Sequence, residues 1–159
     1  MYPYTREPPM TTEFAEFVAQ QDAQNTIQLN VTKWTLMLCD ALKQNYIDYS
    51  IKSHKRSANL ADRVEEKAYH DVCVQELMNG KCDYDFFIES GRKYHKIIMK
   101  DSGDSNSVHA FVDKKTGEVY KSASWKAPAK GVRYDLRLIE QREWLLENAD
   151  WAGSYLYRR

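Results

Sequence analysis

The strongest indication of structure in the C-terminal half of the chain is Val108-His-Ala-Phe-Val-Asp-Lys-Lys-Thr-Gly-Glu-Val-Tyr-Lys-Ser122. Apolar and polar side chains alternate on both sides of Lys114-Lys-Thr-Gly117, which favours a tight turn between two antiparallel strands. Residues 94–100 alternate in the same way, and Asp101-Ser-Gly-Asp-Ser-Asn106 between these segments is typical of a turn. With residues 84–89 as a further candidate strand, the sequence predicts an antiparallel meander of three to four strands.

The N-terminal half lacks residues that break helices. Neither glycine nor proline occurs between Met10 and Asn79, and such long stretches favour helices. We expect helices from Thr11 or Thr12 onward, over residues 29–47 and over residues 59–78, with residues 50–57 as a solvated loop. The alternation of Ile27, Leu29 and Val31 leaves a short strand open at the start of the second helix. A last helix is expected over residues 135–148.

These elements predict one α+β domain. A chain of 159 residues, 43% of them apolar, is long enough for a single domain with a core. We expect residues 1–10 to form a flexible N-terminus and residues 11–159 to form the domain. In that domain, N-terminal helices pack on a C-terminal three- to four-stranded antiparallel meander, and a C-terminal helix closes it.

The same composition excludes several classes of protein. No run approaches the roughly 18 apolar residues of a membrane span, so no membrane association is expected. The first residues do not have the basic and then apolar character of a secretory signal. Three cysteines, Cys39, Cys73 and Cys82, do not suggest a disulfide framework, so a reducing cytosol is expected.

Charge is distributed unevenly, although the formal net charge is zero. Residues 1–90 contain 9 basic and 14 acidic side chains, a net charge of −5, whereas residues 91–137 contain 11 basic and 5 acidic side chains, a net charge of +6. A basic sheet on an acidic helical body can steer an acidic partner to one face. Alternatively, the two halves neutralise each other and the asymmetry has no role.

Strand alternation predicts which side chains form the basic face. The aliphatic side chains of the strands are expected to meet the helices, which leaves an outer face with aromatic rings among cations. A helix that covered this face would instead make its rings ordinary core residues. The predicted outer face contains Tyr94, Lys96, Lys100, His109, Phe111 and Tyr120.

The segment Ser124-Trp-Lys-Ala-Pro-Ala-Lys-Gly-Val-Arg-Tyr134 follows the last predicted strand. Pro128 stiffens it and disfavours a helical Ala127. A stiff loop that presents Trp125, Lys126, Lys130 and Arg133 suits an acidic protein surface or a phosphate backbone. In the alternative interpretation, Trp125 covers the edge of the sheet and the cations only keep the loop solvated.

Catalytic and cofactor motifs are missing from the sequence. It contains no phosphate-binding loop, no dinucleotide fingerprint and no nucleophile elbow, so we expect no enzyme activity and no cofactor. The one candidate for a zinc site is His70, Cys73, Cys82 and His95. Its spacing matches no familiar zinc motif, and Cys73 also fits the buried face of a helix, so no metal is expected.

One part of the chain resembles known proteins. The 30 residues from Ser107 to Leu136, which include Ser107-Val-His-Ala-Phe-Val-Asp and Ser124-Trp-Lys-Ala-Pro-Ala-Lys-Gly, resemble small proteins of tailed bacteriophages of marine bacteria and cyanobacteria. The closing Asp150-Trp-Ala-Gly-Ser-Tyr-Leu-Tyr157 is similar to phage proteins too. Those proteins have no assigned activity. The resemblance implies a viral origin and a location in the host bacterial cytoplasm or the virion, and it transfers no catalytic residue.

Two functions fit these observations. The first is a non-enzymatic phage protein that binds a protein partner, either a host factor that it modulates or a virion component, because interfaces are rich in Tyr, Trp and Arg. The second is an accessory protein that binds single-stranded nucleic acid, because aromatic rings stack on unpaired bases while lysines contact phosphates. We expect the first.

Overall fold

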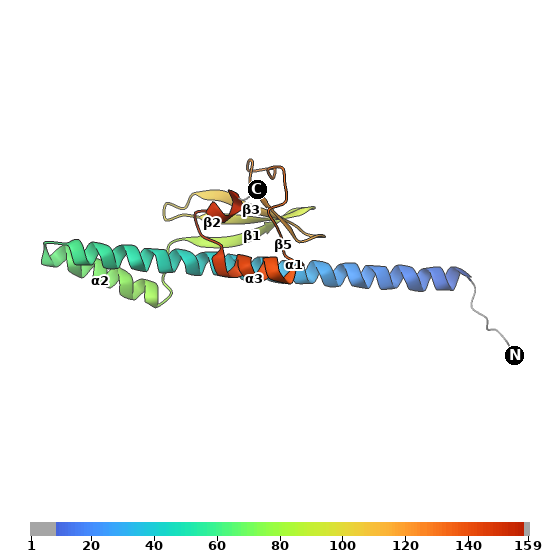
Figure 1. The fold of residues 1–159 in the computed structure, drawn as a ribbon, viewed down its shortest axis with the longest axis horizontal. Coiled ribbons are helices and arrows are strands. Elements are labelled where there is room, and N and C mark those ends of the chain that lie inside the picture. Colours follow the sequence, from blue (N-terminus) through green and yellow to red (C-terminus); the bar gives the residue numbers. More distant parts are fainter. Residues whose placement is uncertain (1–8, 158–159) are drawn as a thin grey trace.

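The protein combines three α-helices, a 3-10 helix and one five-stranded sheet in the residues that the structure describes. The computed structural model describes residues 9–157 (Figure 1). The elements in chain order are α1 (Pro9–Leu60), α2 (Val64–Met78), β1 (Asp85–Ser90), β2 (Tyr94–Lys100), β3 (Asn106–Asp113), β4 (Glu118–Lys121), β5 (Tyr134–Asp135), α3 (Ile139–Asn148) and η1 (Ser154–Tyr157). The predicted α+β class is confirmed, and the flexible terminus expected for residues 1–10 lies almost wholly outside the described residues.

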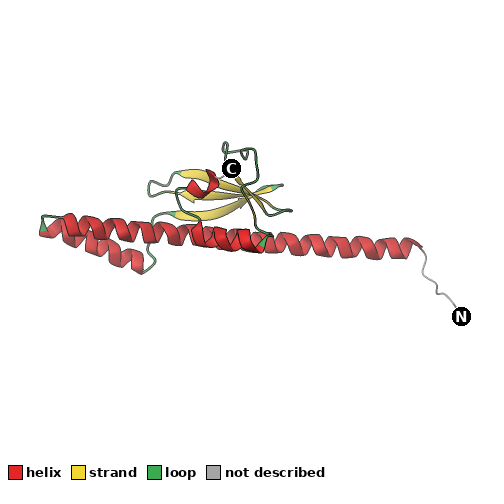
Figure 2. Cartoon of the chain, in the orientation of Figure 1, coloured by secondary structure: helices red, strands yellow, loops and turns green. Residues whose placement is uncertain are grey.

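Helix α1 is one continuous element of 52 residues, where the sequence suggested two helices and the start of a third (Figure 2). The expected loop over residues 50–57 is wrong, as is the alternative of a strand at Ile27. The hydroxyl side chains within α1 are accommodated in the helix, because they can bond to the carbonyl one turn back. Thr26 and Thr35 donate in this way to Asp22 and Val31, at 2.9 and 2.7 Å.

Helix α2 folds back along the C-terminal end of α1 (Figure 1). It begins at Val64, five residues later than predicted, because α1 extends to Leu60 and a short turn follows. The imidazole Nδ1 atoms of His54 on α1 and His70 on α2 lie 2.9 Å apart, so this pair joins the two helices. Gly80 follows α2 with φ +83°, a left-handed conformation that glycine adopts readily and that ends many helices.

The five strands form an antiparallel meander in the order β1-β2-β3-β4-β5. The turn between β3 and β4 forms as its composition suggested: the Asp113 carboxylate accepts the N–H groups of Lys115 and Thr116, and Gly117 has φ +75°. The two-residue strand β5 was not predicted. It includes Asp135, the first residue of the expected last helix, and α3 begins only at Ile139.

The core lies between the inner face of the sheet and helices α1 and α3. Side chains of α1 that are fully buried, such as Leu38 and Leu42, belong to one cluster with Ile97, Val112 and Val119 of the sheet. All three α-helices therefore lie on the same side of the sheet (Figures 1 and 2). In the described part of the chain, no helix has both the length and the hydropathy that crossing a bilayer requires.

Candidate interaction face on the outer side of the sheet

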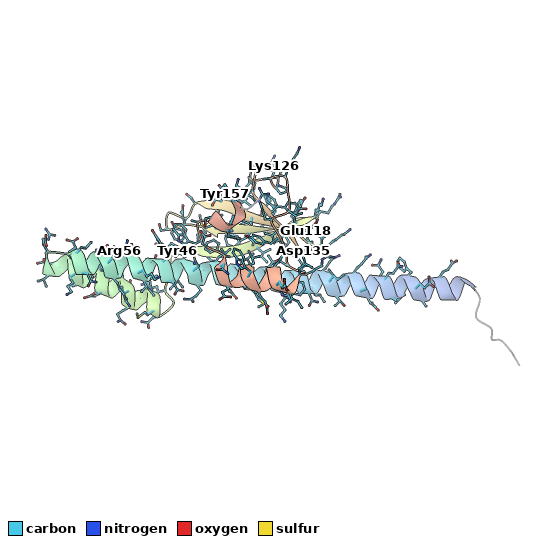
Figure 3. The ribbon with its side chains drawn as sticks, in the orientation of Figure 1. Tyr46, Arg56, Glu118, Lys126, Asp135 and Tyr157 are labelled. Carbon is cyan, nitrogen blue, oxygen red and sulfur yellow. The ribbon has the colours of Figure 1, made fainter. Side chains whose placement is uncertain are left out.

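The outer side of the sheet, opposite to α1, has no helix over it in residues 9–157 (Figure 1). A loop of residues 122–131 rises there instead, and Lys126 on this loop points away from the helices (Figure 3). Below, we call the group of Tyr94, Lys96, Tyr120 and Trp125, together with the loop lysines Lys126 and Lys130, the aromatic–lysine face. The alternative in which a helix covers this side is therefore not what the fold adopts.

Phe111 is the base of the aromatic–lysine face. It projects to the outer side of β3 yet is only 1% exposed, because neighbouring side chains surround it. The ring of Tyr94 meets it edge to face with centroids 5.5 Å apart, and Tyr94 meets Tyr120 in the same manner at 6.1 Å. Phe111 was predicted as a contact residue, and its burial makes it a support for the rings above it.

Lys96 and Trp125 form the centre of the face. The Lys96 ammonium lies 5.0 Å from the Trp125 ring centroid and 6.0 Å from that of Phe111, which is the range of cation–π attraction. Glu89 on β1 lies 3.9 Å from the same ammonium. Trp125 remains 45% exposed, so one large ring is held in place by a cation and still presents area to solvent.

The loop that presents Trp125 is held by its own backbone. The N–H groups of Ala123 and Ser124 both donate to the carbonyl of Ala127 at 3.1 Å, and Ala129 donates to Lys121 at 2.7 Å. Ser122 and Pro128 form an isolated bridge across the base. The stiffness expected from Pro128 thus has a structural basis in this bonded base.

Arg133 supports the loop through its guanidinium group. Its Nε donates to the carbonyl of Leu156 at 2.7 Å, and one terminal nitrogen donates to Lys130 and Gly131 at 3.2 and 3.0 Å. These bonds tie the end of the loop to η1. Arg133 was predicted to contact a partner, and its donors are instead directed at backbone carbonyls of this chain.

The two loop lysines are available for a partner. Lys126 and Lys130 are exposed, and neither has a carboxylate within 4.0 Å among the described residues. In contrast, Lys100 is bonded to Asp104 at 3.2 Å and lies four residues along β2 from Lys96, about 13 Å away. The structure therefore brings the loop lysines together with Trp125 and leaves Lys100 apart.

His109 does not lie on the outer face, which corrects the sequence prediction. Ile97 pairs with Ala110 but Ile98 pairs with Val108, so His109 is the extra residue of a β-bulge. Its Nε2 is 2.8 Å from the Tyr155 hydroxyl, and its ring meets the edge of the core residue Phe86. Burial lowers the pKa of His109 from 6.5 to about 4, and it raises the pKa of Tyr155 well above 10, so both groups are neutral near pH 7.

The residues of the candidate zinc site are dispersed. Both nitrogens of buried His95 are hydrogen bonded, to Ser90 at 2.7 Å and to Thr32 at 3.1 Å, and burial lowers its pKa. His70 pairs with His54 instead of with a cysteine. No cluster of three or more His, Cys, Asp or Glu side chains with metal-binding geometry occurs in residues 9–157.

A second exposed surface was missed by sequence reasoning. Phe14 and Phe17 near the start of α1 are 65% and 56% exposed. All residues from 13 to 26 are exposed, because this end of α1 projects beyond the sheet and the other helices (Figure 1). The signal in the sequence is the polar series Gln20-Gln-Asp-Ala-Gln-Asn25, which cannot continue a buried stripe.

A family model matches residues 14–158, which include every element from the exposed end of α1 to η1. The chain belongs to the family DUF7717. It is a family of unknown function, so membership in DUF7717 assigns no activity to the aromatic–lysine face. Neither a curated protein nor a solved structure gives a significant match to this DUF7717 chain.

Proposed function

We propose that this protein is a non-enzymatic binding module whose aromatic–lysine face takes an acidic surface of a protein partner. The observation that supports this most is Trp125, 45% exposed, fixed over Lys96 and flanked by the unpaired Lys126 and Lys130. A rigid tryptophan with cations around it is the composition of an interface hot spot. The loop is preorganised by its backbone bonds, so binding loses little conformational freedom.

The ring geometry favours protein over nucleic acid as the partner. Tyr94 packs against both Phe111 and Tyr120 edge to face, so the rings do not form a row of parallel open surfaces for successive bases. The Lys96 ammonium lies over the Trp125 ring, in a place that a stacked base would otherwise need.

The resemblance to phage proteins determines where to look for the partner. We propose that it is a host factor or a virion component, encountered in the host bacterial cytoplasm. The test is affinity capture from a nuclease-treated bacterial lysate, with the wild type beside Trp125→Ala and a Lys126→Glu/Lys130→Glu double variant. One stoichiometric protein that the wild type retains and both variants lose is the expected result. Equal capture by all three proteins would refute the proposal.

Single-stranded nucleic acid is the second candidate, because Trp125 is exposed and the loop lysines are unpaired. Fluorescence anisotropy with a labelled single-stranded oligonucleotide tests it. An affinity that falls steeply with salt and weakens in Trp125→Ala would favour it. Absence of binding at low salt would eliminate it.

A further inference from the structure

The exposed end of α1 is a helical arm that packs against nothing else among residues 9–157. We define the arm as residues 13–28, about 24 Å of helix at 1.5 Å per residue. A single helix of this length is marginal in water unless it packs or carries ion pairs along its surface. The arm has no such pairs, because no basic residue occurs between Glu13 and Lys33. Contact with another surface would therefore stabilise it.

The large apolar side chains of the arm, Phe14 and Phe17, lie toward the side of α1 on which the sheet lies. Val31, Thr35, Leu38 and Leu42 form the buried seam of α1, with alternating spacings of four and three residues. Continued toward the N-terminus, the same spacing gives Gln28, Gln24, Gln21, Phe17 and Phe14. A seam with this period drifts only about 20° per heptad on a straight helix. Over the two to three heptads that separate the phenylalanines from this seam, the drift adds up to about 40–60°, so Phe17 and Phe14 lie on the flank of the face that is buried under the sheet.

Charge points to the surface that complements the arm. Glu13, Glu16 and Asp22 give the arm a charge of −3, and they lie beside the exposed phenylalanines. The aromatic–lysine face has the opposite character: a large exposed ring, Trp125, and the unpaired cations Lys126 and Lys130. Acidic side chains with aromatic anchors are the partner chemistry that we propose for this face, so the inference rests on the proposed function.

Within one chain the arm and the face cannot meet. The sheet lies on one side of α1, and the aromatic–lysine face is directed away from that helix (Figures 1 and 3). The arm extends from the sheet along the axis of α1, with its seam facing the same side as the sheet. A second copy, related by a two-fold axis level with the sheet, satisfies both surfaces. Its arm crosses the first copy's outer face, and its own outer face meets the first copy's arm, so the contact is isologous.

We propose that the protein forms a two-fold dimer in which each arm lies across the aromatic–lysine face of the other copy. Phe14 and Phe17 pack against the Trp125 loop, while Glu13 and Glu16 pair with Lys126 and Lys130. The partner class is a second copy of this chain. The same face remains the site for a foreign acidic protein when such a partner displaces the arm.

Charge-swap variants test this dimer by light scattering coupled to size exclusion. The wild type is expected at twice the chain mass of 18.7 kDa at low salt. The arm variant Glu13→Lys/Glu16→Lys and the face variant Lys126→Glu/Lys130→Glu are each expected at 18.7 kDa, and the combination of all four substitutions should restore the dimer. The matched control is Glu143→Lys/Glu147→Lys, two exposed acids of α3, which should remain dimeric.

Amide hydrogen exchange, measured at several protein concentrations, locates the interface. Amides of residues 13–28 should gain protection with protein concentration in the wild type and not in the face variant. A wild type that stays at one chain mass, or a dimer that the face variant leaves intact, would overturn the inference; the second result would indicate pairing between the arms. If the wild type is monomeric but the face variant still loses the captured protein, the proposed function stands and only the dimer fails.

Discussion

Acid should destabilise this protein, and His109 should account for a measurable part of the effect. His109 occupies the bulge of β3, 2.8 Å from the Tyr155 hydroxyl and against Phe86, where burial lowers its pKa to about 4. Asp150 opposes that shift, but burial has the larger effect on the pKa. In the unfolded chain the pKa returns to the ordinary value of 6.5. Between these two values the unfolded state binds a proton that the folded state excludes, so stability falls as the pH falls.

The loss of folding stability can be calculated from the two pKa values of His109, about 4 in the folded protein and 6.5 in the unfolded chain. At pH 7 the group contributes almost nothing, and at pH 5 the proton bound by the unfolded chain costs the fold about 2 kcal/mol. The perturbation is His109→Gln, whose amide can still bond to Tyr155 but does not titrate. The wild type should lose about 2 kcal/mol more stability than the variant between pH 7 and 5.

Urea unfolding followed by tryptophan fluorescence across this pH range is the appropriate assay. Carboxylates and His95 titrate in both proteins and cancel in the difference, so the absolute stability of the variant does not matter. Two stability curves that run parallel from pH 7 to 5 would show that His109 does not contribute to the acid sensitivity of the fold. They would mean that His109 takes up its proton without leaving its buried position.

Three substitutions, with Lys126→Met as the control for the last of them, test the buried ring of the outer face, the β3–β4 turn and the support of the loop, each by urea unfolding. Phe111→Ala should cost about 3–5 kcal/mol, because it removes a fully buried ring; a cost below about 1 kcal/mol would contradict its burial. Gly117→Ala should cost at least about 1 kcal/mol, because the position has φ +75° and a Cβ would lie 3.3 Å from Val31 Cγ2; an unchanged midpoint would contradict the turn geometry. Arg133→Met should cost about 1.5–3 kcal/mol through its bonds to backbone carbonyls, whereas Lys126→Met should stay within about 0.5 kcal/mol; equal effects would contradict their different roles.

The strands could be predicted because their signals are local. Alternation over residues 94–100 gave the bounds of β2 as the structure has them, and the Asp113–Gly117 turn forms through side chain to backbone bonds within five residues. Strand β5 has only two residues and exists through its pairing with β4. No pattern of two residues could have indicated it.

The long helix was missed because apolar periodicity reports burial and not helicity. The arm is exposed, and the residues between Ser50 and Ala58 alternate between a buried side toward α2 and a solvated side. Their charges looked like a loop. Only the absence of glycine and proline was common to all of α1 after Pro9, and that absence permits a helix without requiring one.

The candidate face could be predicted in composition but not in roles. Strand alternation placed Tyr94, Lys96 and Tyr120 on the outer side correctly, but it continued through the bulge and so assigned His109 to the wrong face. The role of Arg133 depends on where η1 lies, 23 residues away in sequence. Roles of this kind arise from tertiary contacts that a periodic pattern does not contain.

The arm of a second copy and a foreign acidic protein would compete for the aromatic–lysine face. A face that holds the arm of a second copy cannot at the same time hold a foreign acidic protein, because both would occupy Trp125 and the loop lysines. Displacing an arm exposes its phenylalanines and three unpaired acids, so a foreign partner must bind more tightly than the arm to replace it. Self-association through this face would therefore make binding selective. Only a partner whose aromatic and acidic groups fit the face better than the protein's own helix would displace the arm.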